Sequence, residues 1–297
     1  MTRRRVDVGI VTWNTRDLTL RAIDAALAST GVDVRVLVRD NGSTDGTAEA
    51  VASRHPDVLV DVGHNVGFAA GVNALLARSD APWFLTLNSD AWPEPDALRA
   101  MVELATREQR AAAVAPLLLR PDGSLEPSAH AFPRLLTAAA LPLSHRRSEQ
   151  LLMAPGWRHD QTREVDWAVG AALLLRRAAV AEIGALDDSF FMYGEDLEWC
   201  WRAREAGWEV WFTPAAVVRH VGNASGAQRF GPGRDQVAIA NAATVVAKYR
   251  GRGYAMAWRL LNALTAGRAW ARARSRGDRD LAAHYRRQLS AHLGRAR

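Results

Sequence analysis

The amino-acid sequence predicts an α/β fold, in which helices flank a sheet, with a helical tail at the C-terminal end. Segments rich in β-forming residues alternate with segments of helical periodicity from Val6 to Leu87, and each β-rich segment ends in a polar or glycine-rich turn. From Asp235 onward the pattern is helical and increasingly rich in arginine. Such alternation is typical of a parallel sheet, whose ligands bind beyond the carboxyl ends of the strands.

The expected elements follow one another in a regular order. We expect strands at residues 6–13, 34–38, 58–62, 83–87 and 113–119, and helices that begin near residues 16, 47, 67 and 95. Residues 124–164 show no clear pattern. Beyond them we expect a strand at 165–175, a short helix ending at 183, a helix at 195–206 that Gly207 closes, and a short strand at 208–212.

Composition excludes several classes of protein. Of the 297 residues, 48% are apolar and 24% are charged, as in soluble globular proteins, and no stretch approaches the ~18 apolar residues of a membrane-spanning helix. The basic start is followed by too short an apolar run for a signal peptide. The single cysteine, Cys200, excludes an intrachain disulfide and fits a reducing compartment. We therefore expect a cytoplasmic protein.

Positive charge is concentrated in the tail. Residues 248–297 hold 13 basic and 2 acidic residues, a net charge of +11, whereas residues 1–247 carry −5. Tyr254, Trp258 and Leu261 recur at i, i+4 and i+7, a spacing that predicts an interfacial helix on an anionic membrane. Packing on the catalytic domain and dimerisation stay open as alternatives. We expect a catalytic domain at residues 1–233 and a basic helical region at 234–297.

Polar residues follow the first two predicted strands. Thr12-Trp13-Asn14 ends the first strand, and Asp40-Asn41-Gly42-Ser43 ends the second, so both should meet at one edge of the sheet. An aromatic face can stack on a base, and a carboxylate can accept a hydrogen bond from the imide N–H of uracil or thymine. The alternative is a tight turn built by Asn-Gly and Asp-Gly. Asn65-Val-Gly67-Phe68 through Asn73 is a weaker signal, since its glycines allow either ligand approach or close helix packing.

Two further segments indicate a cation site. Asn88-Ser89-Asp90 directly follows the fourth strand, where a carboxylate can hold a divalent cation that bridges a diphosphate. Alternatively, Asp90 caps the next helix. His220 follows the last strand region and gains meaning only if it returns to the same edge as Asp90.

A cluster of acidic residues begins the helix at 195–206. Glu195 and Asp196 follow the apolar run Phe190-Phe-Met-Tyr193, which should lower the local dielectric and raise the pKa of Asp196 toward the range of a general base. Complementation of the helix dipole is the alternative reading. The sequence has no G-x-S-x-G motif, and Cys200 lies in an apolar helix, so no nucleophile is indicated.

Taken in order, these segments resemble the inverting family 2 glycosyltransferases with the GT-A fold, a Rossmann-like mixed sheet flanked by helices. The likeness covers roughly residues 6–220, and the segments that carry it are VGIVTWN, DNGSTDGT, NVGFAAGVN, LNSD, WAVGAALLL, FFMYGEDLEWCWRAREAGW and His220. Within the family the chain is most similar to bacterial rhamnosyltransferases that act on polyprenyl-diphosphate sugars, and PDGSLEPSA contributes to this likeness.

The resemblance implies a role for individual residues. Asp196 corresponds to the catalytic base, beside Glu195 in the Glu-Asp motif. Asp90 and His220 correspond to ligands of Mg²⁺ or Mn²⁺, although Asn88 replaces the first acidic residue of the usual DxD-like motif. Trp167 is expected on the acceptor side. The residues expected to bind the nucleotide-sugar are Thr12, Trp13, Asn14, Asp40, Asn41, Ser43, Asn65, Gly67, Phe68, Asn73, Asn88 and Ser89. Trp13 stands where the family more often has tyrosine.

The resemblance therefore implies a metal-dependent inverting glycosyltransferase of cell-wall or polysaccharide biosynthesis. We expect it to move a sugar, L-rhamnose from dTDP-rhamnose, to a hydroxyl of a glycan or polyprenyl-linked acceptor, with peripheral contact at the inner face of the cell membrane and no nucleic-acid partner. Two alternatives stay open. A sugar-nucleotide pyrophosphorylase should carry a glycine-rich basic loop where this chain has Thr12-Trp-Asn-Thr15, and a non-catalytic binder would use only the basic tail.

Overall fold

The computed structural model describes residues 4–140, 159–222 and 224–294 of the chain. The chain divides into two compact units. The first spans Met1–His130 and Arg158–Ser225, and the second spans Ala131–Trp157 and Gly226–Arg297. The second unit therefore joins the C-terminal tail to a segment from the middle of the sequence.

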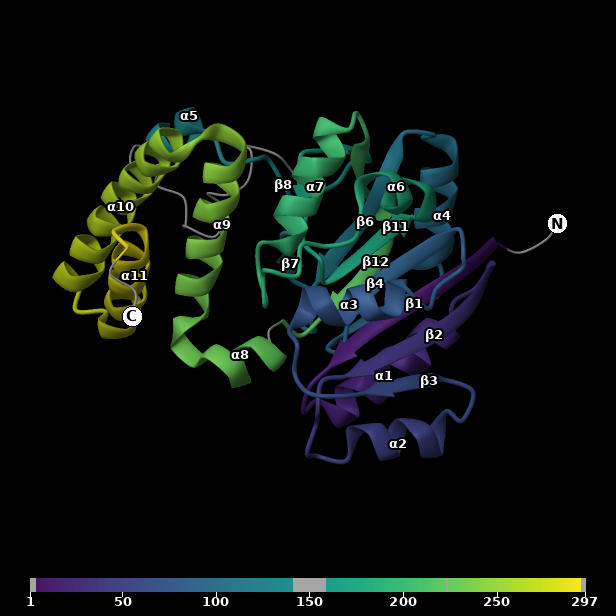
Figure 1. Ribbon diagram of the computed structural model, residues 1–297. Coiled ribbons are helices and arrows are strands. Elements are labelled where there is room, and N and C mark those ends of the chain that lie inside the picture. The colour runs from purple at the N-terminus through teal and green to yellow at the C-terminus, as the bar shows by residue number, and fades with distance from the viewer. Residues whose placement is uncertain (1–3, 141–158, 223, 295–297) are drawn as a thin grey trace. The chain divides into compact units, whose positions relative to one another are not determined.

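The first unit contains the sheets and the helices that flank them (Figure 1). Its strands are β1 (Arg4–Thr12), β2 (Val32–Asp40), β3 (Leu59–Val62), β4 (Trp83–Asn88), β5 (Ala91–Pro93), β6 (Ala111–Leu119), β7 (Leu125–Glu126), β8 (Ala129–His130), β9 (Arg163–Val165), β10 (Trp167–Ala168), β11 (Ala172–Arg176) and β12 (Glu209–His220). Its helices are α1 (Arg16–Leu27), α2 (Thr47–Arg54), α3 (Phe68–Leu76), α4 (Ala97–Arg107), α6 (Arg177–Ile183) and α7 (Glu195–Glu205). The short helix α8 (Ala224–Phe230), which follows β12, spans the boundary between the two units, and η3 (Gly231–Gly233) belongs to the second unit.

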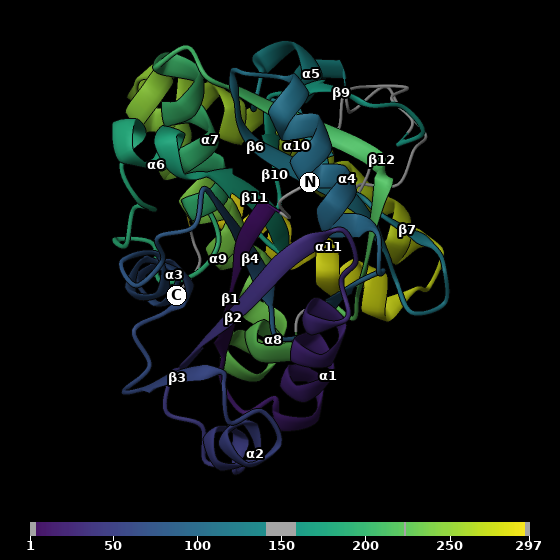
Figure 2. The same cartoon turned by 90° about the vertical axis from the view of Figure 1, so that its right-hand side faces the viewer.

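A mixed sheet organises this unit, as the sequence predicts. In the described residues it has the order β3-β2-β1-β4-β11-β6-β12-β5, with β7 beside β6 and β9 beside β12. Figure 2 shows β3, β2 and β1 side by side. The pairs β3-β2, β2-β1, β1-β4 and β6-β12 are parallel, whereas β11 runs antiparallel to both β4 and β6. The carboxyl ends of β1, β2, β4 and β12 therefore point to one edge.

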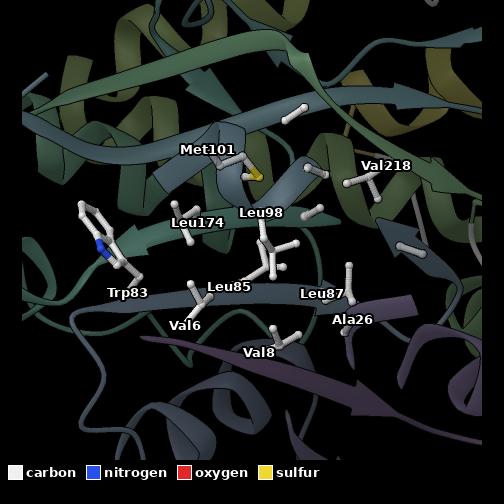
Figure 3. Packing of buried hydrophobic residues seen from close by; sticks show 14 of the residues in the cluster. Val6, Val8, Ala26, Trp83, Leu85, Leu87, Leu98, Met101, Leu174 and Val218 are labelled. Carbon is white, nitrogen blue, oxygen red and sulfur yellow. The ribbon is translucent and has the colours of Figure 1, made fainter. Parts of the chain in front are cut away.

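One cluster of the hydrophobic core lies on one face of the sheet. Val6 and Val8, alternate residues of β1, are fully buried and pack with Ala26 of α1 and with Leu98 and Met101 of α4 (Figure 3). This period of two is the signature of a strand, and burial of each large aliphatic side chain contributes about 2 kcal/mol to folding. Gly71 of α3 contacts Val11 on the opposite face, so helices cover both faces.

Two expected strands differ most from the structure. The expected strand at 165–175 is broken into β10 and β11, because Gly170 donates its N–H to a side chain instead of to a neighbouring strand. The last strand, β12, is longer than expected and extends to His220, since it pairs with β6, β5 and β9 through an irregular register between Thr213 and Val217. This extension brings His220 to the carboxyl edge.

The second unit is helical. Its described helices are α5 (Leu135–Ala140), α9 (Arg234–Arg250), α10 (Arg252–Ser275) and α11 (Arg279–His292). The last three lie side by side (Figure 1). Trp258 of α10 is 4% exposed and packs with Ala138 and Ala243, with Leu261 against the same cluster. Tyr254 accepts a hydrogen bond at its hydroxyl from the backbone N–H of Leu135. The expected outward stripe of Tyr254, Trp258 and Leu261 is therefore wrong, because these side chains pack inside the unit.

Candidate active site

The predicted motifs meet at the carboxyl edge of the sheet. Thr12 pairs with Asp40 in the register of β1 and β2, and Asn88 ends β4 beside Val11. His220 ends β12 and pairs with Ala91 of β5. Strand geometry thus brings four strand ends that are far apart in sequence to one edge.

The loops after β1 and β2 are locked together by hydrogen bonds. The backbone N–H of Asn14 donates to Ser43 Oγ at 2.9 Å, and the N–H of Thr44 donates to Asn14 Oδ1 at 2.7 Å. Asn14 adopts a positive φ of 52°, which asparagine tolerates. The N–H of Arg16 donates to Asp45 Oδ2 at 3.0 Å. These bonds fix the two loops relative to one another.

Asp40 has one engaged and one unengaged carboxylate oxygen. Oδ1 accepts from the N–H of Ser43 at 2.7 Å, while Oδ2 is buried and has no hydrogen-bond partner among the described residues. The side chain is 1% exposed. A buried acceptor of this kind costs free energy unless a donor reaches it. Trp13, at the end of β1, is partly exposed. Trp13 can therefore stack on a base, and Asp40 Oδ2 can accept a hydrogen bond from one N–H of that base.

A glycine turn connects this edge to the acidic helix. The N–H of Phe68 donates to the carbonyl of Phe191 at 2.7 Å, and Gly67, with φ of +89°, lies so close that a Cβ there would collide with that carbonyl. Asn65 Oδ1 accepts from the N–H of Gly67 at 3.1 Å. Only glycine fits this position, so the turn is built for close approach.

Two asparagines expected at the donor site hold the backbone together. Asn41 donates through Nδ2 to the carbonyl of Gly67 at 3.0 Å. Asn73 bonds the backbone of Leu186 in both directions, at 2.9 and 3.0 Å. The amide groups of both side chains are thus engaged in positioning loops, and donor contact by either residue stays a prediction.

Hydroxyl groups connect the first helix to the loop after β4. Thr12 and Thr15 lie 2.9 Å apart at their hydroxyls, and Thr15 donates to Ser89 Oγ at 2.9 Å. Thr12 also bonds Thr19 of α1 at 2.7 Å. All four side chains are buried, so they order the loop that carries Asp90.

Asp90 and His220 meet, as their sequence positions require for a shared cation. His220 Nε2 lies 3.2 Å from Asp90 Oδ1, and His220 Nδ1 lies 3.1 Å from Glu126 Oε2. Burial alone would lower the pKa of His220, but the hydrogen bonds to Asp90 and Glu126 outweigh it and raise the pKa to about 9. The amide of Asn88 lies 3.3 Å from His220 Nε2.

This donor set fits a divalent cation that also binds a diphosphate. The imidazole Nε2 and the carboxylate oxygen lie 3.2 Å apart, so one cation could contact both once it displaces the proton of Nε2, and Glu126 on the second ring nitrogen is the kind of partner that orients a metal-binding histidine. The described residues contain no group of three His, Cys, Asp or Glu side chains arranged around one metal position. A cation there would complete its ligands with phosphate oxygens, as Mg²⁺ and Mn²⁺ commonly do.

Asp196 lies at the start of α7 with its carboxylate held by two backbone donors. Gly170 N–H donates to Oδ2 at 3.0 Å, and Leu197 N–H donates to Oδ1 at 2.8 Å. Burial raises the pKa of Asp196, and these two hydrogen bonds act against that rise. The side chain is still partly exposed. An oriented carboxylate of raised basicity that solvent can reach is suited to accept a proton.

Its neighbour Glu195 is in a different environment. The side chain is 4% exposed, and its Oε2 has no hydrogen-bond partner among the described residues. Burial, and next the charge of Asp196, raise the pKa of Glu195 well above its ordinary value. The helix begins after Tyr193 and Gly194, both with positive φ, and Tyr193 at 67° is strained for a bulky residue. The turn therefore fixes where both carboxyl groups point.

Trp167 lies on β10, three residues before Gly170, and stacks on His130 of β8 with ring centroids 4.6 Å apart. Burial lowers the pKa of His130 to about 3, so its ring is neutral. A neutral ring behind a partly exposed indole forms a rigid aromatic surface next to the segment that holds Asp196.

Two functional groups escaped the sequence analysis. Glu126 contacts His220, and the Gly170 N–H contacts Asp196. The only available signal for Glu126 was its place in PDGSLEPSA, a segment that the resemblance to rhamnosyltransferases had already included. The contact of the Gly170 N–H could not be predicted, because a backbone N–H is present at nearly every residue and gives no signal in composition or spacing.

Comparison with known proteins gives a consistent result. Residues 7–180 match the glycosyl transferase family 2 domain. Over 212 residues the chain is 34% identical to N-acetylglucosaminyl-diphospho-decaprenol L-rhamnosyltransferase of Mycobacterium tuberculosis, a match that covers 63% of this chain and 66% of that protein. It is 28% identical over 189 residues to the pre-mycofactocin glycosyltransferase of the same organism, covering 63% of this chain and 37% of that protein.

Solved structures share the fold. The mannosyltransferase PcManGT of Pyrobaculum calidifontis, in complex with GDP-Man and Mn²⁺, superposes with a TM-score of 0.63 at 17% identity, covering 99% of this chain and 88% of that one. GalNAc-T7 with UDP, GalNAc and Mn²⁺ superposes with a TM-score of 0.58 at 14% identity, covering 82% and 48%. The predicted GT-A architecture is thereby confirmed.

Proposed function

The chain belongs to glycosyl transferase family 2 and is a glycosyltransferase, and we propose that it transfers L-rhamnose from dTDP-rhamnose, with inversion, to a hydroxyl of a polyprenyl-diphosphate-linked acceptor. The name of the mycobacterial relative, whose length this chain matches over 66%, supports both the sugar and the acceptor. Family membership argues against a pyrophosphorylase or a purely basic binder. We place the reaction at the cytoplasmic face of the membrane. We assign catalysis to the domain formed by the chain up to about residue 233.

The single observation that supports the mechanism is the carboxylate of Asp196, which backbone donors orient and solvent can reach. Two backbone donors orient it, and burial raises its pKa, so it can accept the proton of the attacking hydroxyl at one oxygen. An acceptor oxygen that attacks opposite the leaving group needs only one base. Burial and the charge of Asp196 raise the pKa of Glu195, which disfavours a second negative charge beside Asp196.

The nucleotide would be recognised by Asp40 and Trp13. Oδ2 of Asp40 is a buried acceptor without a partner, and the N3–H of thymine or uracil is a donor that satisfies it. Trp13 would stack on the same base. Adenine presents no ring N–H to this acceptor, whereas guanine presents its N1–H, so the contact disfavours adenine and the comparison with a GDP-sugar tests the choice of thymine or uracil over guanine.

Asp90 and His220 would hold the divalent cation, Mn²⁺ or Mg²⁺, against the diphosphate of the donor. Bound there, the cation supplies charge neutralisation for the leaving nucleoside diphosphate. Glu126 accepts from His220 Nδ1 and so presents Nε2 toward Asp90. Asn88 contributes an amide in place of a second carboxylate, which lowers the negative charge at the site.

Trp167 would contact the acceptor. Its ring is braced by His130 and lies on the chain segment that leads to Gly170. Aromatic faces bind the apolar faces of sugar rings, so the indole suits the sugar of the acceptor that presents the attacking hydroxyl.

A donor panel tests this function. The full chain is incubated with a short polyprenyl-diphosphate N-acetylglucosamine and one of dTDP-rhamnose, UDP-glucose, UDP-galactose or GDP-mannose, with Mn²⁺, Mg²⁺ or EDTA, and nucleoside diphosphate release is measured. We expect release from dTDP-rhamnose that needs both the acceptor and the cation. Equal release from GDP-mannose, or full release in EDTA, would contradict the proposed donor or the proposed cation.

A further inference from the structure

Exposed side chains form a ridge along α10, the longest helix of the second unit. They recur at every fourth residue, so each side chain lies next to the one before it and the row winds gradually around the helix. Met256, Leu260 and Leu264 form the middle of the ridge and are 55%, 49% and 60% exposed. The complete ridge consists of Arg252, Met256, Leu260, Leu264, Arg268 and Arg272, all exposed.

The opposite face of the same helix is already used. Ala255, Trp258, Ala263 and Ala266 are at most 5% exposed and pack within the helical unit. Arg259 donates to the backbone carbonyls of His292 and Ala291 at the end of α11. The internal packing of this unit therefore uses the other face of α10, and about half of the surface of Met256, Leu260 and Leu264 stays exposed to water.

The charged residues of α10 itself all have one sign. The sequence of α10 contains five arginines and no acidic residue, and residues 248–297 carry a net charge of +11. Arginines stand at both ends of the three apolar residues. An apolar centre between cationic ends is the pattern of a helix that lies in a membrane interface, with its apolar side chains below the headgroups and its cations at the phosphates.

We propose that this ridge of α10 docks the enzyme on an anionic lipid surface. A second copy of the chain is a poorer occupant, because two such ridges would bring like charges together and three half-exposed side chains fall far short of the ~800 Å² per partner of a stable interface. A nucleic-acid backbone would use the arginines but would leave the apolar centre in water. No helix of the described residues is long and apolar enough to cross a membrane, so contact would be along the surface.

The test is co-sedimentation of the full-length protein with vesicles of phosphatidylglycerol and phosphatidylcholine, and with vesicles of phosphatidylcholine alone. No donor or acceptor is present, so the result is independent of the proposed reaction. The ridge variant is Leu260→Gln/Arg268→Gln. The matched control is Leu27→Gln/Arg107→Gln, which removes the same residue types from exposed positions on α1 and α4. Circular dichroism establishes that all three proteins are folded.

We expect the wild type to bind anionic vesicles, to release at high salt, and to bind neutral vesicles much more weakly. One arginine near an anionic leaflet contributes about fivefold in affinity and a half-buried leucine a similar factor, so the ridge variant should bind roughly 25-fold more weakly and the control should equal wild type. The proposal is overturned by equal binding to both vesicle types, by equal loss in ridge variant and control, by no binding, or by a dimer that only the ridge variant disrupts.

Discussion

The backbone N–H of Gly170 donates to Oδ2 of Asp196 across 26 positions of sequence, at 3.0 Å. Because Gly170 precedes β11, which lies beside β4, this bond positions the start of α7 relative to the carboxyl edge of the sheet. A Cβ on Gly170 would lie 3.6 Å from the Cβ of Asp196, so the two residues touch. The sheet thereby sets the position of the proposed base, independently of the flexible side-chain torsions around it.

Glu195 should make the protein less stable as the pH rises. Its pKa in the folded state is raised above that in the unfolded chain, so its contribution is fully present below the unfolded pKa and is lost as pH rises through the folded pKa. Glu195→Gln, which removes the charge and keeps the shape, should therefore show a smaller drop in melting temperature between about pH 5 and pH 9. Identical pH dependence in both proteins would contradict the raised pKa.

Asp40→Asn should weaken the binding of pyrimidine nucleotides. The substitution can keep the bond from Ser43 N–H but places an amide donor where the imide N–H of the base should meet an acceptor. An unpaired buried donor costs about 1–3 kcal/mol, so the affinity for dTDP should fall roughly 10- to 100-fold. Calorimetric titration with dTDP, UDP and GDP measures this. If the variant binds dTDP as well as wild type does, Asp40 does not read the base.

Glu126 should control cation affinity through His220. Glu126→Leu removes the acceptor at Nδ1 and should weaken Mn²⁺ binding about 10- to 100-fold, whereas Glu126→Gln keeps an acceptor and should retain most of it. Mn²⁺ binding is followed by electron paramagnetic resonance without donor, and nitrogen NMR of metal-free protein follows the pKa of His220, which should fall in Glu126→Leu because the acceptor at Nδ1 is lost. Wild-type affinity and a wild-type pKa of His220 in Glu126→Leu would remove Glu126 from the site.

Gly67→Ala should destabilise the protein more than Gly46→Ala does. Both glycines precede a helix with positive φ, but Gly67 has φ 89° and ψ −176°, a region essentially confined to glycine, and a Cβ there collides with the Phe191 carbonyl. Gly46 is left-handed, with φ 80° and ψ 20°, and has open space around it. We expect a loss of about 3 kcal/mol for Gly67→Ala and about 1 kcal/mol for Gly46→Ala. Equal melting temperatures of the two variants would refute the close approach.

The residues that end strands could be located from the sequence because strand periodicity and turn chemistry are local properties. Asp40 and Asn88 end strands and Asp196 lies in the first turn of a helix, so the edge of the sheet near which each lies could be inferred from the sequence. The mixed sheet and its match to known GT-A structures confirm the predicted fold class.

Contacts made by irregular segments could not be inferred. Glu126 reaches His220 through the two-residue strand β7, which is too short for a periodic signal. In the C-terminal helices the sequence prediction was wrong for a different reason. Tyr254, Trp258 and Leu261 recur at a helical spacing, and so do the ridge residues Met256, Leu260 and Leu264. The spacing in the sequence does not distinguish which of these two apolar stripes packs inward. Packing against Ala138, from a distant part of the sequence, decides it.

The most direct measurement for the central claim, that Asp196 is the base of a glycosyl transfer, is the rate of dTDP release by Asp196→Asn set against its affinity for dTDP-rhamnose. The amide cannot take up the proton, but it leaves the nucleotide-binding residues unchanged. We expect the acceptor-dependent rate to fall about 10²- to 10⁴-fold while the dissociation constant of the donor stays within about twofold of wild type. A near wild-type rate of release would contradict the account, and so would a loss of donor affinity large enough to explain the lost rate.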